Sequence, residues 1–384
     1  MKDPNFNAKL IGYNHLEVEK YLNDLRLVGS ISKLFSESQI PYLHYRVTEL
    51  IYCLSFNAEN LARADLSVDA KLKSNGIGIK TFIETEQMQK IAEFNNQQRL
   101  YKTLSSLDKV KKIAELRNNR LDFTLKVYGL KDIIYHCIVR NEKGFWLFEE
   151  KMDFIDITKI KITKENKNTL FFFDGKEEYK FDTTKSTLYK RFKIKECFAF
   201  VPVVIFDDPL GMLRKINYNE IMNEQEITFP ETIIVPLYST SRSGKKVVYA
   251  RSGLNQWNAK GRRRELDEVY IPWNTILKNS YDTFFPPRKT PFEVKLPNDE
   301  ILLMSICQAG GKAIMSNPNK ALGKWLLRDV LGIKQRTLVT YEMLLEIGID
   351  AVAFQKLGEG KYMLDFRKVG EYEKFLEKEV MPDD

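Results

Sequence analysis

The sequence predicts a mixed helix-and-sheet domain followed by a small β-barrel. Apolar residues recur every three or four positions between residues 16 and 56, which is typical of amphipathic helices. From Leu121 onward they alternate in short runs separated by Gly, Asn and Asp, as in strands joined by turns. The second half of the chain is again rich in strand-like runs, with one convincing helix among them. Such an order favours two successive domains of different architecture.

The amino-terminal part is predicted to be mainly helical, with helices over 16–35 and 47–56. A hairpin within 67–82 interrupts this pattern, with turn residues at Lys73–Gly76. After it, residues 85–121 again have helical spacing, and Thr85 is a suitable N-cap.

Short strands are predicted over 122–130, 133–139, 144–150, 169–181 and 197–206. In the carboxy-terminal half, strands are predicted over 232–239, 245–251, 268–273, 291–297, 300–306 and 361–366, with helices over 320–333 and 340–348. A polar, irregular stretch at 207–230 is interpreted as a linker, so the predicted domains are 1–206 and 231–384.

The composition, with 43% hydrophobic and 12% aromatic residues, is that of an ordinary globular protein. The first residues lack an apolar signal core, and no apolar stretch approaches the ~20 residues of a membrane span, so a cytoplasmic protein is expected. The four cysteines form no CxxC pair, which disfavours a zinc site or a disulfide framework. The three scattered histidines exclude phospholipase-D-type and HNH-type nucleases, and there is no GxxxxGK[ST] phosphate loop.

The positive charge is concentrated in one segment. Residues 233–336 contain 18 Lys or Arg against 8 Asp or Glu, a net charge of +10, whereas the total is +8 and the rest of the chain therefore carries −2. A basic surface of this kind is typical of a protein that binds a polyanion, and it favours nucleic acid as the partner.

The hairpin over 67–82 carries Asp69 on its first strand and Lys80 on its second. Because residues of equal parity share one face of a strand, the two side chains can approach across the ladder. Carboxylates that hold Mg²⁺ and a lysine that neutralises charge on the phosphate are what phosphodiester cleavage needs. An internal Asp–Lys ion pair within a sheet explains the same residues.

This arrangement, over about residues 40–100, resembles the PD-(D/E)XK nuclease core. Gly78 departs from the motif, because the position two before the lysine should be acidic. In the EcoRII-like and NgoMIV-like branch of these restriction nucleases the second acid lies on the next helix. Glu93, in the predicted helix over 86–96, matches that relocated acid, so the resemblance implies Asp69 and Glu93 as Mg²⁺ ligands. It implies Glu49 as a supporting helix-borne acid, and Glu84 is the alternative second ligand.

Two basic stretches are candidates for DNA contacts. Arg can bond guanine bidentately, Asn and Gln can bond adenine, and most other basic side chains contact phosphates. In the first stretch the candidates are Arg251, Asn255, Gln256, Trp257, Asn258, Arg262, Arg263 and Arg264. In the second they are Gln308, Lys312, Asn317, Asn319, Lys320 and Lys324.

Residues 233–366 resemble the double-arm pseudobarrel by which EcoRII-type and BfiI-type restriction enzymes recognise DNA, a fold shared with plant auxin-response factors. The residues that carry the likeness are 251–255, 269–272, 284–286, 308–314, 322–324, 331–332 and 362–366. The resemblance implies two arms that grip the major groove, the first over 251–264 and the second over 308–324.

Together the resemblances imply an α/β nuclease core with a helical amino-terminal part, followed by a DNA-binding pseudobarrel. The expected function is a Mg²⁺-dependent type II restriction endonuclease that acts on double-stranded DNA, with a DNA methyltransferase encoded nearby. The alternative is a non-catalytic, sequence-specific DNA-binding protein derived from such a nuclease. Cutting both strands favours a homodimer, and the apolar helices before residue 60 offer a surface for it.

Overall fold

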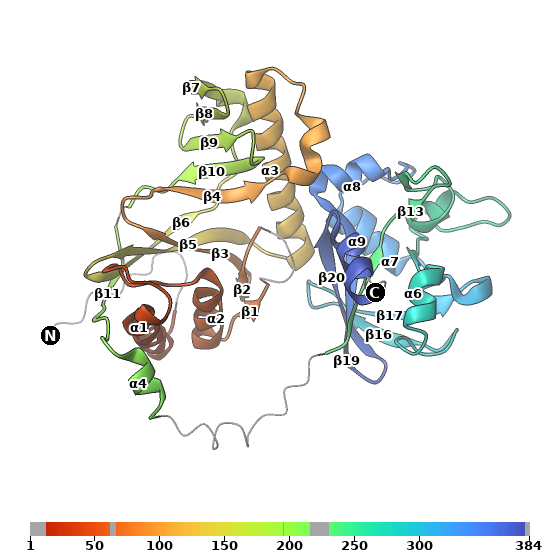
Figure 1. Cartoon of the computed structure of the whole chain (residues 1–384). Coiled ribbons are helices and arrows are strands. Elements are labelled where there is room, and N and C mark those ends of the chain that lie inside the picture. Colours follow the sequence, from red (N-terminus) through yellow and green to blue (C-terminus); the bar gives the residue numbers. More distant parts are fainter. Residues whose placement is uncertain (1–12, 62–66, 195, 216–229, 381–384) are drawn as a thin grey trace. The chain divides into compact units, whose positions relative to one another are not determined.

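The computed structural model describes residues 13–61, 67–194, 196–215 and 230–380. The chain forms two compact units, each described by itself (Figure 1). Unit 1 comprises Met1–Asn95, Leu104–Arg117 and Leu130–Thr228, and unit 2 comprises Asn96–Thr103, Asn118–Gly129 and Phe229–Asp384. Unit 2 thus takes in two segments from the amino-terminal half. Of the predicted linker, residues 216–229 lie outside the described part of the chain.

Unit 1 contains a six-stranded sheet, called sheet A, with two helices on one of its faces (Figure 1). Its strands run in the order β1 (Glu59–Asn60), β2 (Ala70–Leu72), β3 (Asn75–Ile83), β5 (Asp132–Asn141), β6 (Gly144–Lys151) and β11 (Ala199–Pro202). Strands β3 and β5 are parallel, and the other neighbours are antiparallel. The helices are α1 (His15–Ser30) and α2 (Tyr45–Phe56). A short 3₁₀ turn, η1 (Ser32–Leu34), follows α1 in the chain.

The two predicted amino-terminal helices are confirmed. Asn14 caps α1 in a capping box with Glu17, which satisfies amide groups that the first helical turn leaves without partners. The apolar stripe of each helix faces sheet A, where Tyr21 and Tyr52 pack with Ile77, Ile79 and other buried side chains. This packing fixes the orientation of α2.

A second, five-stranded antiparallel sheet, called sheet B, lies against the other face of sheet A. Its order is β4 (Met88–Glu93), β10 (Thr187–Arg191), β9 (Glu178–Asp182), β8 (Thr169–Phe173) and β7 (Lys161–Asn166). Phe192 packs its ring on Tyr135 of β5 at a centroid distance of 5.0 Å. The buried Lys190 of β10 bonds Glu150 of β6 at 2.5 Å. These contacts join the two sheets.

The helix predicted over 85–121 is wrong in its first part. Residues Met88–Glu93 form strand β4 because they pair with β10, about a hundred residues later in the chain. A 3₁₀ turn, η2 (Asn95–Leu100), follows, and the helix α3 begins only at Ser106. It continues to Tyr128, so the strand predicted over 122–130 is also wrong.

Unit 2 is built on a seven-stranded sheet that curls into an open barrel. The order is β12 (Thr232–Pro236), β19 (Ile349–Gly358), β20 (Lys361–Lys368), β16 (Phe292–Lys295), β17 (Ile301–Cys307), β18 (Ala313–Asn317) and β15 (Ile271–Pro272). The end strands β12 and β15 lie beside each other, which curls the sheet. The predicted small barrel is therefore confirmed in outline, and β18 and β19 are strands that the sequence pattern did not indicate.

Short elements surround this barrel. They are the hairpin β13 (Ser239–Thr240) and β14 (Lys246–Val247), η4 (Gly253–Asn258), α6 (Thr275–Ser280), η5 (Ala309–Gly311), α7 (Ala321–Gly323), η6 (Lys324–Val330), α8 (Tyr341–Ile347), α9 (Glu371–Phe375) and η7 (Leu376–Val380). In unit 1, η3 (Ile157–Lys159) and α4 (Pro209–Leu213) complete the elements. Every helix in the described part of the chain is too short or too polar to cross a bilayer.

The barrel core is aromatic. Phe285 packs its ring against Phe292, Phe354 and Tyr362, with centroid distances of 5.0 to 5.1 Å. The second half of α3 belongs to the same core, because Phe123 stands edge-on to Phe366 at 5.0 Å. Dense aromatic packing of this kind gives a rigid support for loops that emerge from the barrel.

Candidate functional site

The hairpin that carries Asp69 and Lys80 closes through Lys73 and Ser74, because Leu72 pairs with Asn75. Lys73 has a positive φ of 55°, as the first residue of such a tight turn requires. The predicted turn at Lys73–Gly76 is therefore two residues too long at its carboxyl side. In the observed register Ala70 pairs with Ile77, and the Ile79 amide donates to Asp69 Oδ2 at 2.7 Å. This bond fixes the Asp69 carboxylate beside β3.

Glu49 of α2 lies within electrostatic range of both hairpin residues. Its side chain is 6% exposed, and Arg46 Nη1 lies 3.2 Å from its Oε2. Burial raises the pKa of the Glu49 carboxyl, and the charge of Asp69 raises that pKa further, while the cations Arg46 and Lys80 act in the opposite direction. The charge of Glu49 is therefore coupled to the charges of Asp69 and Lys80.

A second group responds to the same carboxylates. The thiol of Cys53, one turn after Glu49 on α2, has its pKa raised to about 11 by burial and by the charges of Glu49 and Asp69. Two neighbouring carboxylates thus act on one helix face.

Gly78 stands where the nuclease motif places an acid, and it has no side chain to offer. A Cβ atom at this position would lie 2.6 Å from the Met152 side chain, which fills the space beside β3. Lys80, two residues on, is half-buried. An acid for this site must therefore come from another element, and Glu49 of α2 is such a residue.

The relocated acid on a following helix is not supported, because that helix does not exist. Glu93 is the last residue of strand β4 in sheet B, whereas Asp69 and Lys80 belong to the hairpin of sheet A. The side chains of Lys90 and Asn95 contact its carboxylate. Glu84 is exposed at the end of β3 and accepts a bond of 3.0 Å from Asn141. Asp65, four residues before Asp69 in the sequence, lies outside the described residues.

The residues present fit a hard divalent cation in one respect. Glu49 and Asp69 offer carboxylate oxygens, which Mg²⁺ prefers, and their mutual repulsion is what a bound cation relieves. Within the described ranges of the chain, no group of three His, Cys, Asp or Glu side chains is placed to hold a metal ion. Two protein carboxylates with water and phosphate oxygens completing the shell is a common Mg²⁺ arrangement.

In unit 2, the first predicted arm contains a buried residue, Asn255. Asn255 was predicted to contact DNA, but it is fully buried. Its amide donates to the Tyr249 and Val339 carbonyls at 3.2 and 2.9 Å and accepts from the Val339 N–H at 2.9 Å. The prediction is wrong for this residue, because a side chain with all these bonds inside the protein holds the loop together and does not reach a base.

Arg262 and Arg264 also hold the arm. Arg262 forms a two-pronged contact with the buried Glu268, and Arg264 Nε lies 3.7 Å from the same carboxylate. Arg264 Nη1 donates to the carbonyls of Ala259, Lys260 and Arg262 at 2.7 to 3.1 Å. Because one guanidinium caps three carbonyls, the tip of the arm is preorganised. Arg262 remains 53% exposed and can still face a phosphate.

The segment that follows the first arm contacts the helices at the end of the second arm. Arg328 of η6 bonds Asp267 at 2.6 Å and the Leu266 carbonyl at 3.0 Å. Gly323 of α7 lies so close to the same segment that a Cβ atom would sit 1.9 Å from the Asp267 carbonyl oxygen. Only glycine allows this approach.

Other predicted contact residues are accessible. Arg251, Asn258 and Arg263 in the first arm are exposed, as are Lys312, Asn317, Asn319, Lys320 and Lys324 in the second, whereas Gln256, Trp257 and Gln308 are half-buried. The side-chain amide of Asn258 donates a hydrogen bond to the Ala250 carbonyl at 2.8 Å. The cationic side chains Arg251, Arg263 and Lys324 thus present charge outward from a rigid loop pair.

This combination of an open barrel and two joined basic loops can be compared with known proteins. Residues 231–358 match the family model of the NgoFVII C-terminal B3-like DNA-binding domain, which comes from a restriction enzyme. No curated protein sequence matches the chain. The match covers both arms, so unit 2 is similar to a DNA-binding domain in sequence as well as in architecture. The predicted pseudobarrel is confirmed by this match, which does not extend to unit 1.

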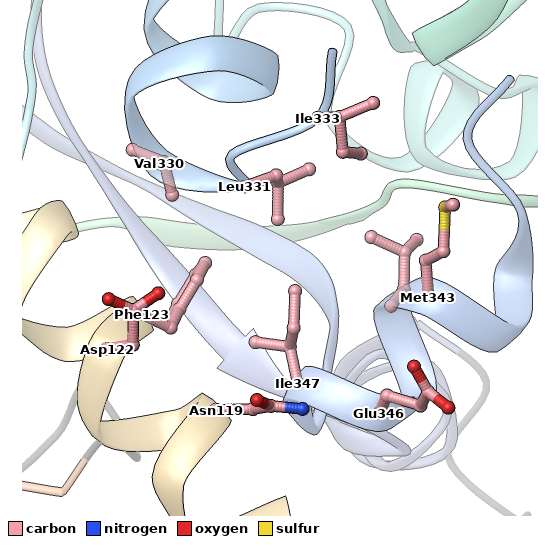
Figure 2. A pocket seen from close by; sticks show the side chains of 10 residues that line it. Asn119, Asp122, Phe123, Val330, Leu331, Ile333, Met343, Glu346 and Ile347 are labelled. Carbon is pink, nitrogen blue, oxygen red and sulfur yellow. The ribbon is translucent and has the colours of Figure 1, made fainter. Parts of the chain in front are cut away.

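Unit 2 also has a pocket. Figure 2 shows this pocket, of about 250 Å³, with Phe123, Leu331 and Ile347 among its walls. Its lining residues are Asn119, Asp122, Phe123, Val330, Leu331, Ile333, Met343, Leu344, Glu346 and Ile347. They are mostly apolar, and they come from α3, the end of η6 and α8. They include no residue predicted to bind DNA.

Proposed function

We propose that this protein is a Mg²⁺-dependent, site-specific endonuclease that cuts double-stranded DNA, of the type II restriction class. Unit 2 recognises the duplex, and Glu49, Asp69 and Lys80 of unit 1 form the hydrolytic site. The single observation that carries the proposal is the electrostatic coupling of Glu49 of α2 to Asp69 and Lys80 of the hairpin, in a chain whose other part is similar to a restriction-enzyme DNA-binding domain.

Each side chain has a distinct role in this proposal. Glu49 and Asp69 hold Mg²⁺, which when bound polarises the phosphate and lowers the pKa of a water. The Ile79 N–H keeps the Asp69 carboxylate in place. Lys80 lies on the adjacent strand, where an ammonium group can neutralise charge that develops on phosphate oxygens. Arg46 balances the negative charge of Glu49 before the metal binds.

A non-catalytic DNA-binding protein is the second candidate. The observation that favours it is Gly78, which offers no carboxylate at the position where the motif has one. If Glu49 does not replace that acid, unit 1 is inert and the chain only binds DNA.

The two candidates differ in a direct assay. The purified chain is incubated with supercoiled and linear genomic DNA, with Mg²⁺ or with EDTA. We expect discrete fragments that require Mg²⁺. Duplex binding without any cleavage, at Mg²⁺ concentrations up to about 10 mM, contradicts the endonuclease and leaves the binding protein.

The source of the second acid has its own test. Glu49→Gln should reduce the cleavage rate at least tenfold, because it removes a carboxylate next to Asp69. Glu93→Gln, the matched change in sheet B, should leave the rate within about twofold, because Glu93 lies on another sheet from Asp69. Initial rates on a single DNA substrate give the ranking. The reverse ranking assigns the second acid to β4.

A further inference from the structure

The outer face of sheet B carries aromatic and cationic side chains in an unusual order. The inner face is buried and includes Leu170, Phe172, Tyr179, Phe181 and Leu188. A half-solvated antiparallel sheet is expected to be polar on its other face, since successive side chains alternate between faces. Here the outer face instead exposes rings between lysines.

One row crosses all five strands. The strand registers pair Lys164 with Phe171, Phe171 with Lys180, Lys180 with Tyr189, and Tyr189 with Lys90. Cation and ring thus alternate from β7 to β4. We call these five residues the lysine–aromatic ladder.

The ladder is accessible, and two of its three lysines lie near its rings. Lys164 and Lys90 are exposed, and Phe171, Lys180 and Tyr189 are half-buried. Lys180 Nζ lies 4.1 Å from the centroid of the Tyr189 ring, and Lys164 Nζ lies 6.0 Å from that of Phe171. These are cation–π contacts at solvent-facing sites, which are weak enough to be exchanged for a stronger anionic partner.

We propose that the lysine–aromatic ladder binds single-stranded nucleic acid. Unpaired bases stack on Phe171 and Tyr189, and the lysines leave the ring faces to contact the phosphates between those bases. Proteins that bind single strands combine exposed aromatic side chains with a basic surface in this way, because every base has a π face. A duplex hides its base faces, so it can use the lysines but not the rings.

The residues around the ladder agree with this ligand. In the next row, Phe173 lies two residues from Phe171 on the same face, ~7 Å along the strand, and offers a further ring. Of the nearby acids, Glu178 bonds Arg191 at 2.7 Å, Glu93 contacts the ladder residue Lys90, and Asp182 accepts bonds from Thr184 and the Lys185 N–H. The ladder row itself contains three cations and no acid. Binding of single strands by the ladder does not require hydrolysis by unit 1. A failure of the proposed nuclease function therefore leaves this proposal unaffected, and the reverse also holds.

The test measures binding of fluorescein-labelled oligo(dT) and oligo(rU), each about 15 nucleotides long, in EDTA. The full chain is used in an Arg251→Ala/Arg263→Ala/Lys324→Ala background, which removes exposed charge from the arms of unit 2. The ladder variant Lys90→Gln/Lys164→Gln/Lys180→Gln should lower affinity at least tenfold. The slope of log K against log salt should become shallower by about 2, since each lost single-strand phosphate contact accounts for about 0.7.

The matched control is Lys131→Gln/Lys143→Gln/Lys151→Gln, which removes the same charge from exposed positions of unit 1 outside sheet B. It should leave both affinity and slope nearly unchanged. Tyr189→Leu should weaken oligo(dT) binding about fivefold or more, and Tyr189→Phe should restore it, because only the ring stacks. Similar loss with oligo(rU) is expected, since the bases and phosphates are shared features.

Three results overturn the proposal. They are no measurable binding of either oligonucleotide at about 50 mM salt, equal losses in the ladder and control variants, and a ladder variant that loses duplex and single-strand binding to the same extent. Thermal unfolding of each variant shows whether a loss of binding reflects a loss of fold; Tyr189→Phe keeps the test decisive if Tyr189→Leu does not fold.

Discussion

Asp69→Asn and Lys80→Ala are each expected to reduce the rate of DNA cleavage at least a hundredfold and to leave duplex binding within about twofold. Asparagine keeps an oxygen that can accept the Ile79 N–H, so the hairpin geometry survives while the negative charge is lost. Loss of that charge removes a metal ligand, and loss of the Lys80 ammonium removes a group that stabilises developing charge on phosphate, a kind of interaction worth about 10² to 10³ in rate.

Cleavage is measured as single-turnover product formation with Mg²⁺, and binding as duplex affinity in EDTA. Matched controls are Asp132→Asn and Lys73→Gln, because both residues are exposed and lie on or next to the same strands. Either Asp69→Asn or Lys80→Ala cutting at the wild-type rate would show that the hairpin is structural. A loss of duplex binding equal to the loss of cleavage would place these residues in DNA recognition.

Local patterns predicted the parts of this fold whose contacts are local. The spacing of apolar residues located α1 and α2, and the turn residues located the β2–β3 hairpin. The turn was predicted two residues too long, because Lys73–Gly76 consists entirely of turn-forming residues and offers more than one turn.

The secondary-structure predictions are wrong where pairing between segments distant in the sequence determines the structure. The sequence of β4 has helical spacing, but β10 supplies a ladder partner that outweighs it. The lysine–aromatic ladder was not visible for the same reason, since its five residues come together only through four strand registers. In contrast, the alternation in 122–130 also satisfies a helix, in which Phe123 and Val127 share one buried face.

The candidate site residues also differ in whether local sequence features are enough to interpret them. Asp69 and Lys80 could be chosen as candidates from the sequence, because a hairpin is a short-range feature, whereas Glu49 was implied by the resemblance to the nuclease core. Their catalytic roles stay predictions. Asn255 could not be assigned correctly, because an Asn in a basic loop is equally suited to a base and to the backbone bonds that it makes with Tyr249 and Val339.

Removing exposed arm charges is expected to have the second large effect. Arg251→Ala/Arg263→Ala/Lys324→Ala should weaken duplex binding at least a hundredfold at about 100 mM salt. Each lost duplex phosphate contact makes the slope of log K against log salt shallower by about 0.9, so three contacts account for about 2.7. The three side chains are exposed on preorganised loops, so their loss should leave the fold intact. Fluorescence anisotropy with a cognate duplex measures both quantities.

The variant Asn255→Ala tests whether Asn255 supports the loop structure or contacts DNA. It leaves the buried N–H and C=O of Val339 without the Asn255 partner, which costs about 1 to 3 kcal/mol for each group, and it also removes the bond to the Tyr249 carbonyl. Unfolding should therefore begin at lower temperature or denaturant concentration, while the folded fraction keeps the wild-type salt slope because no cation is lost. The triple variant should do the opposite, with normal stability and a shallow slope. A normal slope in the triple variant would mean that the B3-like domain meets the phosphates with another surface, since counterion release follows the cations that replace those counterions.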